Sequence, residues 1–153
     1  MKYELKHYTE DKNLIDEILA IMAIHALERV GEKNYAPDVV KIVGLWKMGV
    51  LRLVTMRSHE DKLIGYQGWL LSTPVTNTFL KQATLSYIFV EKESRGSATN
   101  FLEFVKYGVA AVKILGAVDI LAGVDGDQPW LLDKFKLAGF TTERARQIVY
   151  TGG

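Results

Sequence analysis

The stretch from Ser86 to Phe104, SYIFVEKESRGSATNFLEF, holds the residues whose types and spacing most clearly indicate chemistry. An apolar run typical of a strand gives way to a turn of small residues, Arg95 to Asn100, and then to a helical pattern. The first turn of an α-helix leaves backbone N–H groups without partners and carries about half a positive charge. Such a turn can bring these donors against a pyrophosphate. The alternative is an ordinary helix start capped by Ser94 or Ser97.

Four side chains along the chain are of a type that exchanges protons in enzyme sites. Glu91 and Glu93 follow the apolar run, His25 lies inside a helical pattern, and Asp125 follows a later apolar run. Each has a structural alternative: a solvated strand end for the two glutamates, a core or surface histidine, and an ordinary turn or helix-cap signal for Asp125. The histidines at 7, 25 and 59 have no metal-ligand spacing and the chain has no cysteine, so we predict no metal site.

Composition limits the partners of the protein. The 153 residues are 48% hydrophobic and 24% charged, which suits a single domain with a sizeable core spanning residues 1–153. The net charge of +1 offers no electrostatic footprint for nucleic acid or an anionic membrane, so we expect neither as a partner. The charged N-terminus lacks the pattern of a secretory signal, and Lys113 and Asp119 interrupt the most apolar long segment. We therefore expect a soluble, cytoplasmic protein.

The elements that must position these residues follow from periodicity and turn signals. We predict helices over Asn13 to Val30, after Pro37 up to Gly49, over Asn100 to Leu115 and after Pro129 up to Gly139. We predict strands in KYELKHYT, VLRLVTM, LIGYQGWLL, TLSYIFV, VDILAGV and ARQIVYT, with the second and third forming a hairpin. The order β-α-α-β-β-β-α-β-α-β predicts an α/β (α+β) fold, a mixed and mostly antiparallel sheet flanked by helices.

The whole chain resembles the GCN5-related N-acetyltransferase (GNAT) superfamily, whose members use acetyl-CoA as donor. Three segments carry the resemblance: LIGYQGWLL resembles the family's third strand, FVEKESRGSATNFLEF its CoA-holding strand, turn and helix, and DKFKLAGF its late helix before Gly-Phe. The resemblance implies a single GNAT-like domain that binds acetyl-CoA.

The same resemblance implies the residues that contact acetyl-CoA. The family pattern at the turn is Arg or Gln, two residues, Gly, one residue, then Gly or Ala. Two registers fit: Arg95 first, with Ala98 and Asn100 at the glycine positions, or Gly96 as first glycine, with Glu93 at the basic position. We favour the first. The implied contacts are the backbone of Phe89 and Val90, the turn Arg95, Gly96, Ser97, Ala98, Thr99 and Asn100, and Phe135.

The family's chemistry also needs a base for the amine and an acid for the leaving thiolate. We take Glu91 and Glu93 as the first candidate bases and His25 and Asp125 as the next candidates. The acid in the family is usually a tyrosine four residues before the Gly of Gly-Phe, where this chain has Phe135, whose ring cannot donate a proton. Loss of a general acid costs a factor on the order of 10² to 10⁴, so activity stays open.

Two functions remain at this point. The first is an acetyl-CoA-dependent N-acetyltransferase that transfers the acetyl group directly to a small-molecule or protein amine. The alternative is a catalytically inactive protein of the same fold that serves as a binding, assembly or virion component, because small acetyltransferase-like proteins of this size resemble some encoded by bacteriophages. Only Thr141 to Gly153 follow Gly-Phe, where the family commonly has two strands, so completion of the acceptor side by a homo-oligomer or a larger assembly is also open.

Overall fold

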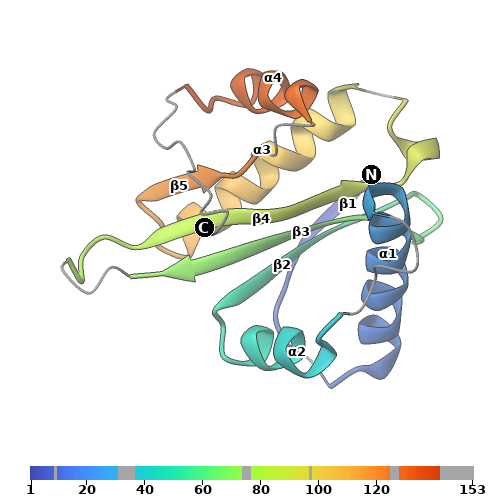
Figure 1. The fold of residues 1–153 in the computed structure, drawn as a ribbon, viewed down its shortest axis with the longest axis horizontal. Coiled ribbons are helices and arrows are strands. Elements are labelled where there is room, and N and C mark those ends of the chain that lie inside the picture. Colours follow the sequence, from blue (N-terminus) through green and yellow to red (C-terminus); the bar gives the residue numbers. More distant parts are fainter. Residues whose placement is uncertain (9, 31–36, 74–76, 97, 125–127, 142–153) are drawn as a thin grey trace, which may run out of the picture.

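The computed structural model describes residues 1–8, 10–30, 37–73, 77–96, 98–124 and 128–141. Its centre is a five-stranded sheet of order β1-β2-β3-β4-β5, in which only the last pair, β4 and β5, runs parallel (Figure 1). The strands are β1 (Lys2–Lys6), β2 (Leu51–Arg57), β3 (Leu63–Ser72), β4 (Gln82–Val90) and β5 (Asp119–Ala122). The predicted mixed and mostly antiparallel sheet is confirmed.

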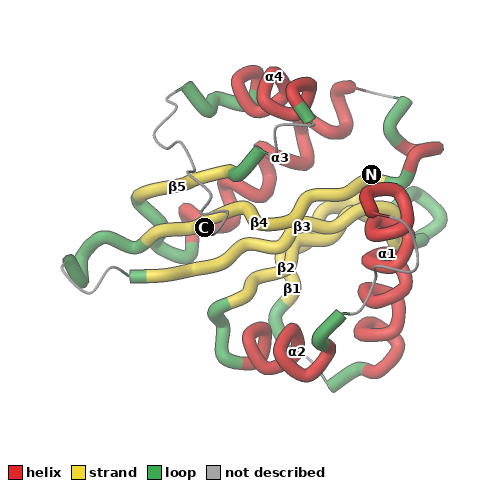
Figure 2. Tube along the Cα trace, viewed as in Figure 1, coloured by secondary structure: helices red, strands yellow, loops and turns green. Residues whose placement is uncertain are grey.

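Helices cover both faces of this sheet (Figures 1 and 2). One face carries α1 (Lys12–Val30) and α2 (Val39–Lys47), and the other carries α3 (Ala98–Ile114) and α4 (Pro129–Leu137). Each face therefore has its own apolar core. Leucine and isoleucine side chains dominate beneath α1 and α2, whereas Trp69, Phe104 and Phe135 fill the core beneath α3 and α4. Within the described residues, no helix is long and apolar enough to cross a membrane.

The first helix packs on the sheet through a stripe of apolar side chains. Leu14, Ile18, Ile21 and Met22 are all buried, and their spacing of three and four residues places them on one helix face. His25 extends this stripe by four residues from Ile21. The imidazole of His25 therefore lies at the end of the buried face of α1, next to the sheet.

The second helix begins slightly later than its proline suggested. Asp38 is its N-cap, and the side chain accepts a hydrogen bond from the Lys41 amide at 2.9 Å. Pro37 therefore precedes the helix and does not lie in its first turn as predicted. After the helix, Gly49 adopts a φ of 76°, the left-handed conformation that ends helices and that glycine accepts without strain.

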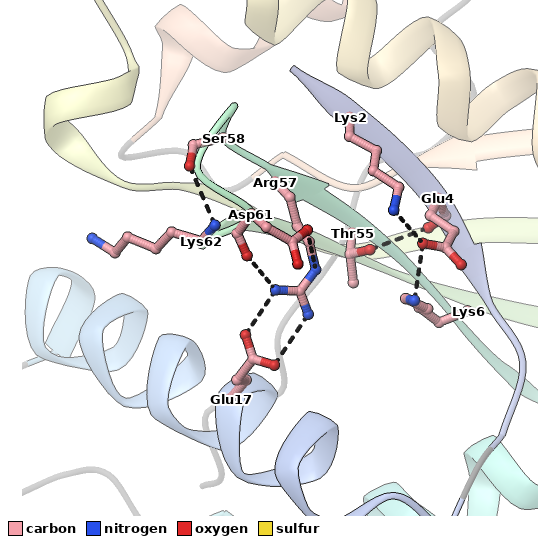
Figure 3. A network of polar contacts seen from close by, with 9 residues as sticks. All are labelled: Lys2, Glu4, Lys6, Glu17, Thr55, Arg57, Ser58, Asp61 and Lys62. Atoms are coloured by element: carbon pink, nitrogen blue, oxygen red, sulfur yellow. Dashed lines mark hydrogen bonds and ion pairs between the residues drawn. The ribbon is translucent and has the colours of Figure 1, made fainter.

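Arg57, at the end of β2, anchors α1 to the sheet (Figure 3). Its guanidinium donates to the two carboxylate oxygens of Glu17 at 2.8 and 3.1 Å and to the Asp61 carbonyl at 2.8 Å. The hydrogen bond to Glu17 is the main cause that raises the pKa of Arg57. This bidentate pair fixes how far along β2 the helix sits, and with it the position of the later turns of α1.

A β-bulge in β4 decides which side chains face which helices. Gly68 pairs with Tyr87, but the next residue, Trp69, pairs with Leu85, so β4 has one extra residue at Ser86. Before the bulge, Leu85 belongs to the core beneath α3. After it, Phe89 belongs to the core beneath α1. The bulge thus turns Tyr87 and Phe89 toward the α1 and α2 face.

The observed elements match the predicted order from β1 to α4, with a short 3₁₀ turn, η2 (Lys92–Ser94), before α3. Pro129 is at the start of α4 and Gly139 has a φ of 104° just after it, as the sequence indicated. The predicted last strand, ARQIVYT, lies outside the described residues.

Candidate active site

The site begins where β5 stops pairing with β4. Pairing covers Gln82–Leu85 with Asp119–Ala122, and no described strand continues along this edge of β4. The Glu91 amide donates to the Ile64 carbonyl of β3 at 2.8 Å. By strand alternation, the amides of Ile88 and Val90 therefore point away from β3, into the opening between β4 and β5. This leaves two backbone N–H groups aimed into a cleft.

A cavity of about 240 Å³ lies beside the end of β4 that has no β5 partner, and we call it the β4 cavity. Its lining comes from α1, β4, the turn before α3, and α3 and α4: His25, Glu28, Arg29, Ile88, Phe89, Val90, Arg95, Phe101, Gln128, Trp130 and Leu131. The cavity thus brings together three of the residues expected to contact acetyl-CoA, namely Phe89, Val90 and Arg95.

Arg95 is tied to both sides of the β4 cavity. Its Nε donates to the Val90 carbonyl at 2.6 Å, and its guanidinium donates to the Glu28 carboxylate at 2.6 Å. The guanidinium also lies over the Phe89 ring, 5.2 Å from its centroid. These contacts place a cation at the mouth of the cavity, joined to the end of β4 and to α1.

The turn between Arg95 and α3 is partly described. Gly96 is exposed, and a Cβ added there would meet no atom within 4 Å. Ser97 lies outside the described residues, while Ala98, Thr99 and Asn100 form the first residues of α3. Ser94 belongs to η2 and does not directly precede α3, which removes it as the helix N-cap. The described geometry therefore keeps a helix N-terminus with open space before it.

A second, larger cavity of about 570 Å³ lies beneath α1 and α2, and we call it the α1–α2 cavity. It is lined by Met22, His25, Ala26, Arg29, Pro37, Asp38, Lys41, Ile42, Leu45, Leu51, Leu53, Tyr66, Leu70 and Tyr87. His25 and Arg29 line both cavities. The last turns of α1 therefore border both cavities.

His25 is held in place by two aromatic side chains. Its Nδ1 lies 2.6 Å from the Tyr66 hydroxyl, and its ring stacks on Phe89 with centroids 4.8 Å apart. Burial is the main cause that lowers the pKa of His25 below 6.5, and the positive charges of Arg29 and Arg95 lower it further against the opposing effect of Glu28. The lowered pKa favours the neutral form of His25, which can accept a proton.

The predicted bases lie elsewhere. Glu91 directly follows β4, is 8% exposed and forms an ion pair with Lys62 at 3.0 Å. Glu93 is exposed in η2, and neither glutamate is among the residues lining the two cavities. Asp125 lies outside the described residues. The catalytic roles of Glu91 and Glu93 stay predictions.

Phe135 is not among the residues that line the two cavities. It is 2% exposed and packs against Phe140, with ring centroids 5.4 Å apart, in the core beneath α3 and α4. Its predicted contact with acetyl-CoA stays a prediction. Among the described residues, no group of three or more His, Asp or Glu side chains is placed to hold a metal ion.

Sequence reasoning missed several of the lining residues. Tyr66, Tyr87 and Ile88 lie in predicted strands but were given no role in the site, and Arg29 was not singled out. Nothing in the sequence linked His25 to a tyrosine 41 residues away. The one available signal was the position of His25 four residues after Ile21, on the face of α1 that the apolar spacing already assigned to the core.

Comparisons with known proteins bear on the fold. No model of a known protein family and no curated protein matches the sequence. An aminoglycoside acetyltransferase from an uncultured soil metagenomic sample, solved in complex with sisomicin, superposes with a TM-score of 0.77 at 14% identity, covering 99% of this chain and 96% of that chain. A ribosomal-protein-alanine N-acetyltransferase from Brucella melitensis gives 0.71 at 12% identity, covering 98% and 99%. A transcriptional regulator from Bacillus halodurans gives 0.74 at 17% identity, covering 97% and 99%.

These similarities confirm the predicted fold: the chain has the fold of the GCN5-related N-acetyltransferases. At such low identities the structural similarity establishes the fold alone. The three similar proteins are described as two acetyltransferases of different substrates and a transcriptional regulator. The function of this chain depends on the side chains that line the β4 cavity and the α1–α2 cavity.

Proposed function

We propose that the protein is an acetyl-CoA-dependent N-acetyltransferase that transfers the acetyl group directly to a small-molecule or protein amine. The observation that carries the proposal is the position of His25. A neutral imidazole, hydrogen-bonded to Tyr66 and stacked on Phe89, lines both the β4 cavity and the α1–α2 cavity. Two substrates, one in each cavity, would meet at a group that can accept a proton.

The β4 cavity suits the donor. Acetyl-CoA supplies the acetyl group as a thioester. The amides of Ile88 and Val90 point into the cavity and can hydrogen-bond an extended ligand arm or polarise a carbonyl oxygen. Arg95 and the N-terminus of α3, with open space at Gly96, would hold the pyrophosphate together with Ser97, Ala98, Thr99 and Asn100. The residues present therefore fit the predicted cofactor.

The α1–α2 cavity suits the amine. A protonated amine cannot attack a carbonyl, so the site must first remove a proton. When Nδ1–H of His25 donates to the Tyr66 oxygen, Nε2 keeps a lone pair and can take that proton. The neutral amine nitrogen then bonds to the acetyl carbon and the C–S bond breaks, so that CoA leaves as a thiolate. The nitrogen gives up its surplus proton as the amide forms, the thiolate takes up a proton through water, and the proton on His25 returns to solvent.

Glu91 is the alternative base. Its pairing with Lys62 and its absence from both cavity linings mean that it would act on the amine only through water. Glu93, exposed in η2, would need a longer water chain. For this reason we assign the proton transfer to His25.

Donor binding is tested by titration calorimetry with acetyl-CoA. Gly96→Glu adds bulk and negative charge where the pyrophosphate would lie, and a Cβ at this position meets no atom within 4 Å. Gly44→Glu is the matched control, because it adds the same side chain to α2, also in open space. We expect binding to be lost in Gly96→Glu alone. Equal affinities in the two variants would mean that the phosphate turn lies elsewhere.

Catalysis is tested by thiol release from acetyl-CoA with a panel of amines. We expect His25→Gln to lower kcat by a factor on the order of 10² to 10⁴ and Glu91→Gln to leave it within a few fold. The reverse order would assign the base to Glu91. Acetyl-CoA binding without turnover of any amine in the wild-type protein would favour the inactive binding or assembly role.

A further inference from the structure

We propose that the acceptor is a free α-amino acid with a large apolar side chain. The inference rests on the proposed function, because it names the amine that the α1–α2 cavity would take. Three properties of that cavity carry it: an apolar floor, the cations Arg29 and Lys41 in its lining, and the spacing between His25 and Arg29 along α1.

The floor and walls of the α1–α2 cavity are apolar. Leu51 and Leu53 of β2 are 3% and 1% exposed, and Leu70 of β3 continues the floor. Ile42 and Leu45 of α2 and Met22 of α1 form further parts of the lining. An apolar ligand body gains roughly 25 cal/mol for each Å² that it buries against such a surface, whereas a polar one loses hydrogen bonds to water.

The charged groups of the described lining are two cations and one carboxylate. Arg29 comes from α1, while Asp38 and Lys41 come from the start of α2. The Asp38 carboxylate is engaged by the Lys41 amide as the cap of α2. A polycationic acceptor such as an aminoglycoside would bring several ammonium groups to a lining that already holds Arg29 and Lys41. An anionic group on the acceptor would instead be attracted by these cations.

The spacing on α1 fits a carboxylate close to the reactive amine. Arg29 lies four residues after His25, about 6 Å further along the helix axis, and both line the same cavity. An amine at His25 therefore has a guanidinium within reach of a group on the neighbouring carbon. Arginine binds carboxylates through two parallel hydrogen bonds. In an α-amino acid, amine, carboxylate and apolar side chain all start from one carbon, which matches the three parts of this cavity.

The test measures binding of the acceptor itself, by calorimetry with and without saturating CoA. The ligands are L-phenylalanine, L-phenylalaninamide, which lacks the carboxylate and resembles a protein N-terminus, and sisomicin. We expect L-phenylalanine to bind about tenfold more tightly than its amide and sisomicin to bind more weakly than either. Arg29→Gln should bring the ratio of acid to amide close to one. Lys113→Gln, which removes a positive charge from α3 outside both linings, should leave the ratio unchanged.

Each result separates this inference from the proposed function. An amide that binds as tightly as the acid, or sisomicin binding best, overturns the inference even if acetyl transfer occurs, and the first result would point to a protein N-terminus. Acid-selective binding that depends on Arg29, without thiol release in the presence of acetyl-CoA, would support the inference and overturn the proposed activity. No binding of L-phenylalanine under either condition also overturns the inference.

Discussion

The substitution Gly108→Ala tests the packing that joins α3 to the sheet. Gly108 lies inside α3, opposite Gln67 and Trp69 of β3. Gln67 donates to the carbonyl of Phe104 at 2.7 Å and accepts from the Trp69 indole at 2.8 Å. The Gln67 side chain thus satisfies an indole N–H and a helix carbonyl, and both Gln67 and Trp69 are 0% exposed. Only glycine leaves room for this contact.

The cost follows from the distances. A Cβ at position 108 would overlap Oε1 of Gln67 and lie 3.0 Å from Nε1 of Trp69, so the glutamine must move and both hydrogen bonds are lost or distorted. Losing buried hydrogen bonds costs about 1–3 kcal/mol each. The better helix propensity of alanine returns about 1 kcal/mol. We therefore expect Gly108→Ala to lower the free energy of unfolding by about 1–5 kcal/mol.

Urea unfolding, followed by circular dichroism and tryptophan fluorescence, measures this difference. Gly44→Ala is the matched control, because Gly44 also lies inside a helix but its added Cβ meets no atom within 4 Å. It should gain up to about 1 kcal/mol from helix propensity alone. A Gly108→Ala protein as stable as wild type would refute the described contact between Gln67 and α3.

Two further predictions concern charge. Because the pKa of His25 in the folded protein lies below 6.5, the unfolded chain binds more protons than the folded protein between that lowered pKa and pH 6.5. The free energy of unfolding should therefore rise with pH across this window, by at most about 1.4 kcal/mol per pH unit. Urea unfolding at several pH values measures this slope, and His25→Gln should remove it. Glu17→Gln breaks the bidentate pair with Arg57 and should lower the free energy of unfolding by about 0.5–1 kcal/mol, measured by thermal denaturation. The effect is small because the Glu17 side chain is 42% exposed, and water screens the pair. Asp16→Asn, one residue earlier and exposed, should change the free energy of unfolding little.

Much of the fold could be predicted because its signals are local. The apolar spacing of α1 and the glycines at 49 and 139, both with positive φ after helices, are encoded within a few residues. The donor side of the site was predicted in part for the same reason: a strand, a turn and a helix follow one another directly, and Phe89, Val90 and Arg95 do line one cavity. The acceptor side has no such contiguous segment, and sequence reasoning placed its base on Glu91 and Glu93.

The sequence by itself determined the order of elements, the family-like strand, turn and helix, and the apolar faces, because each depends on periodicity or on a backbone conformation within a short segment. Only the tertiary structure decided which side chains meet. The extra residue at Ser86 turns Phe89 toward α1, the pair between Arg57 and Glu17 holds that helix on the sheet, and His25 then lies against Tyr66 and between two cavities. Strand register and helix docking are set by contacts between residues far apart in the chain, and a shift of one residue in a strand would send the same side chains to the other face.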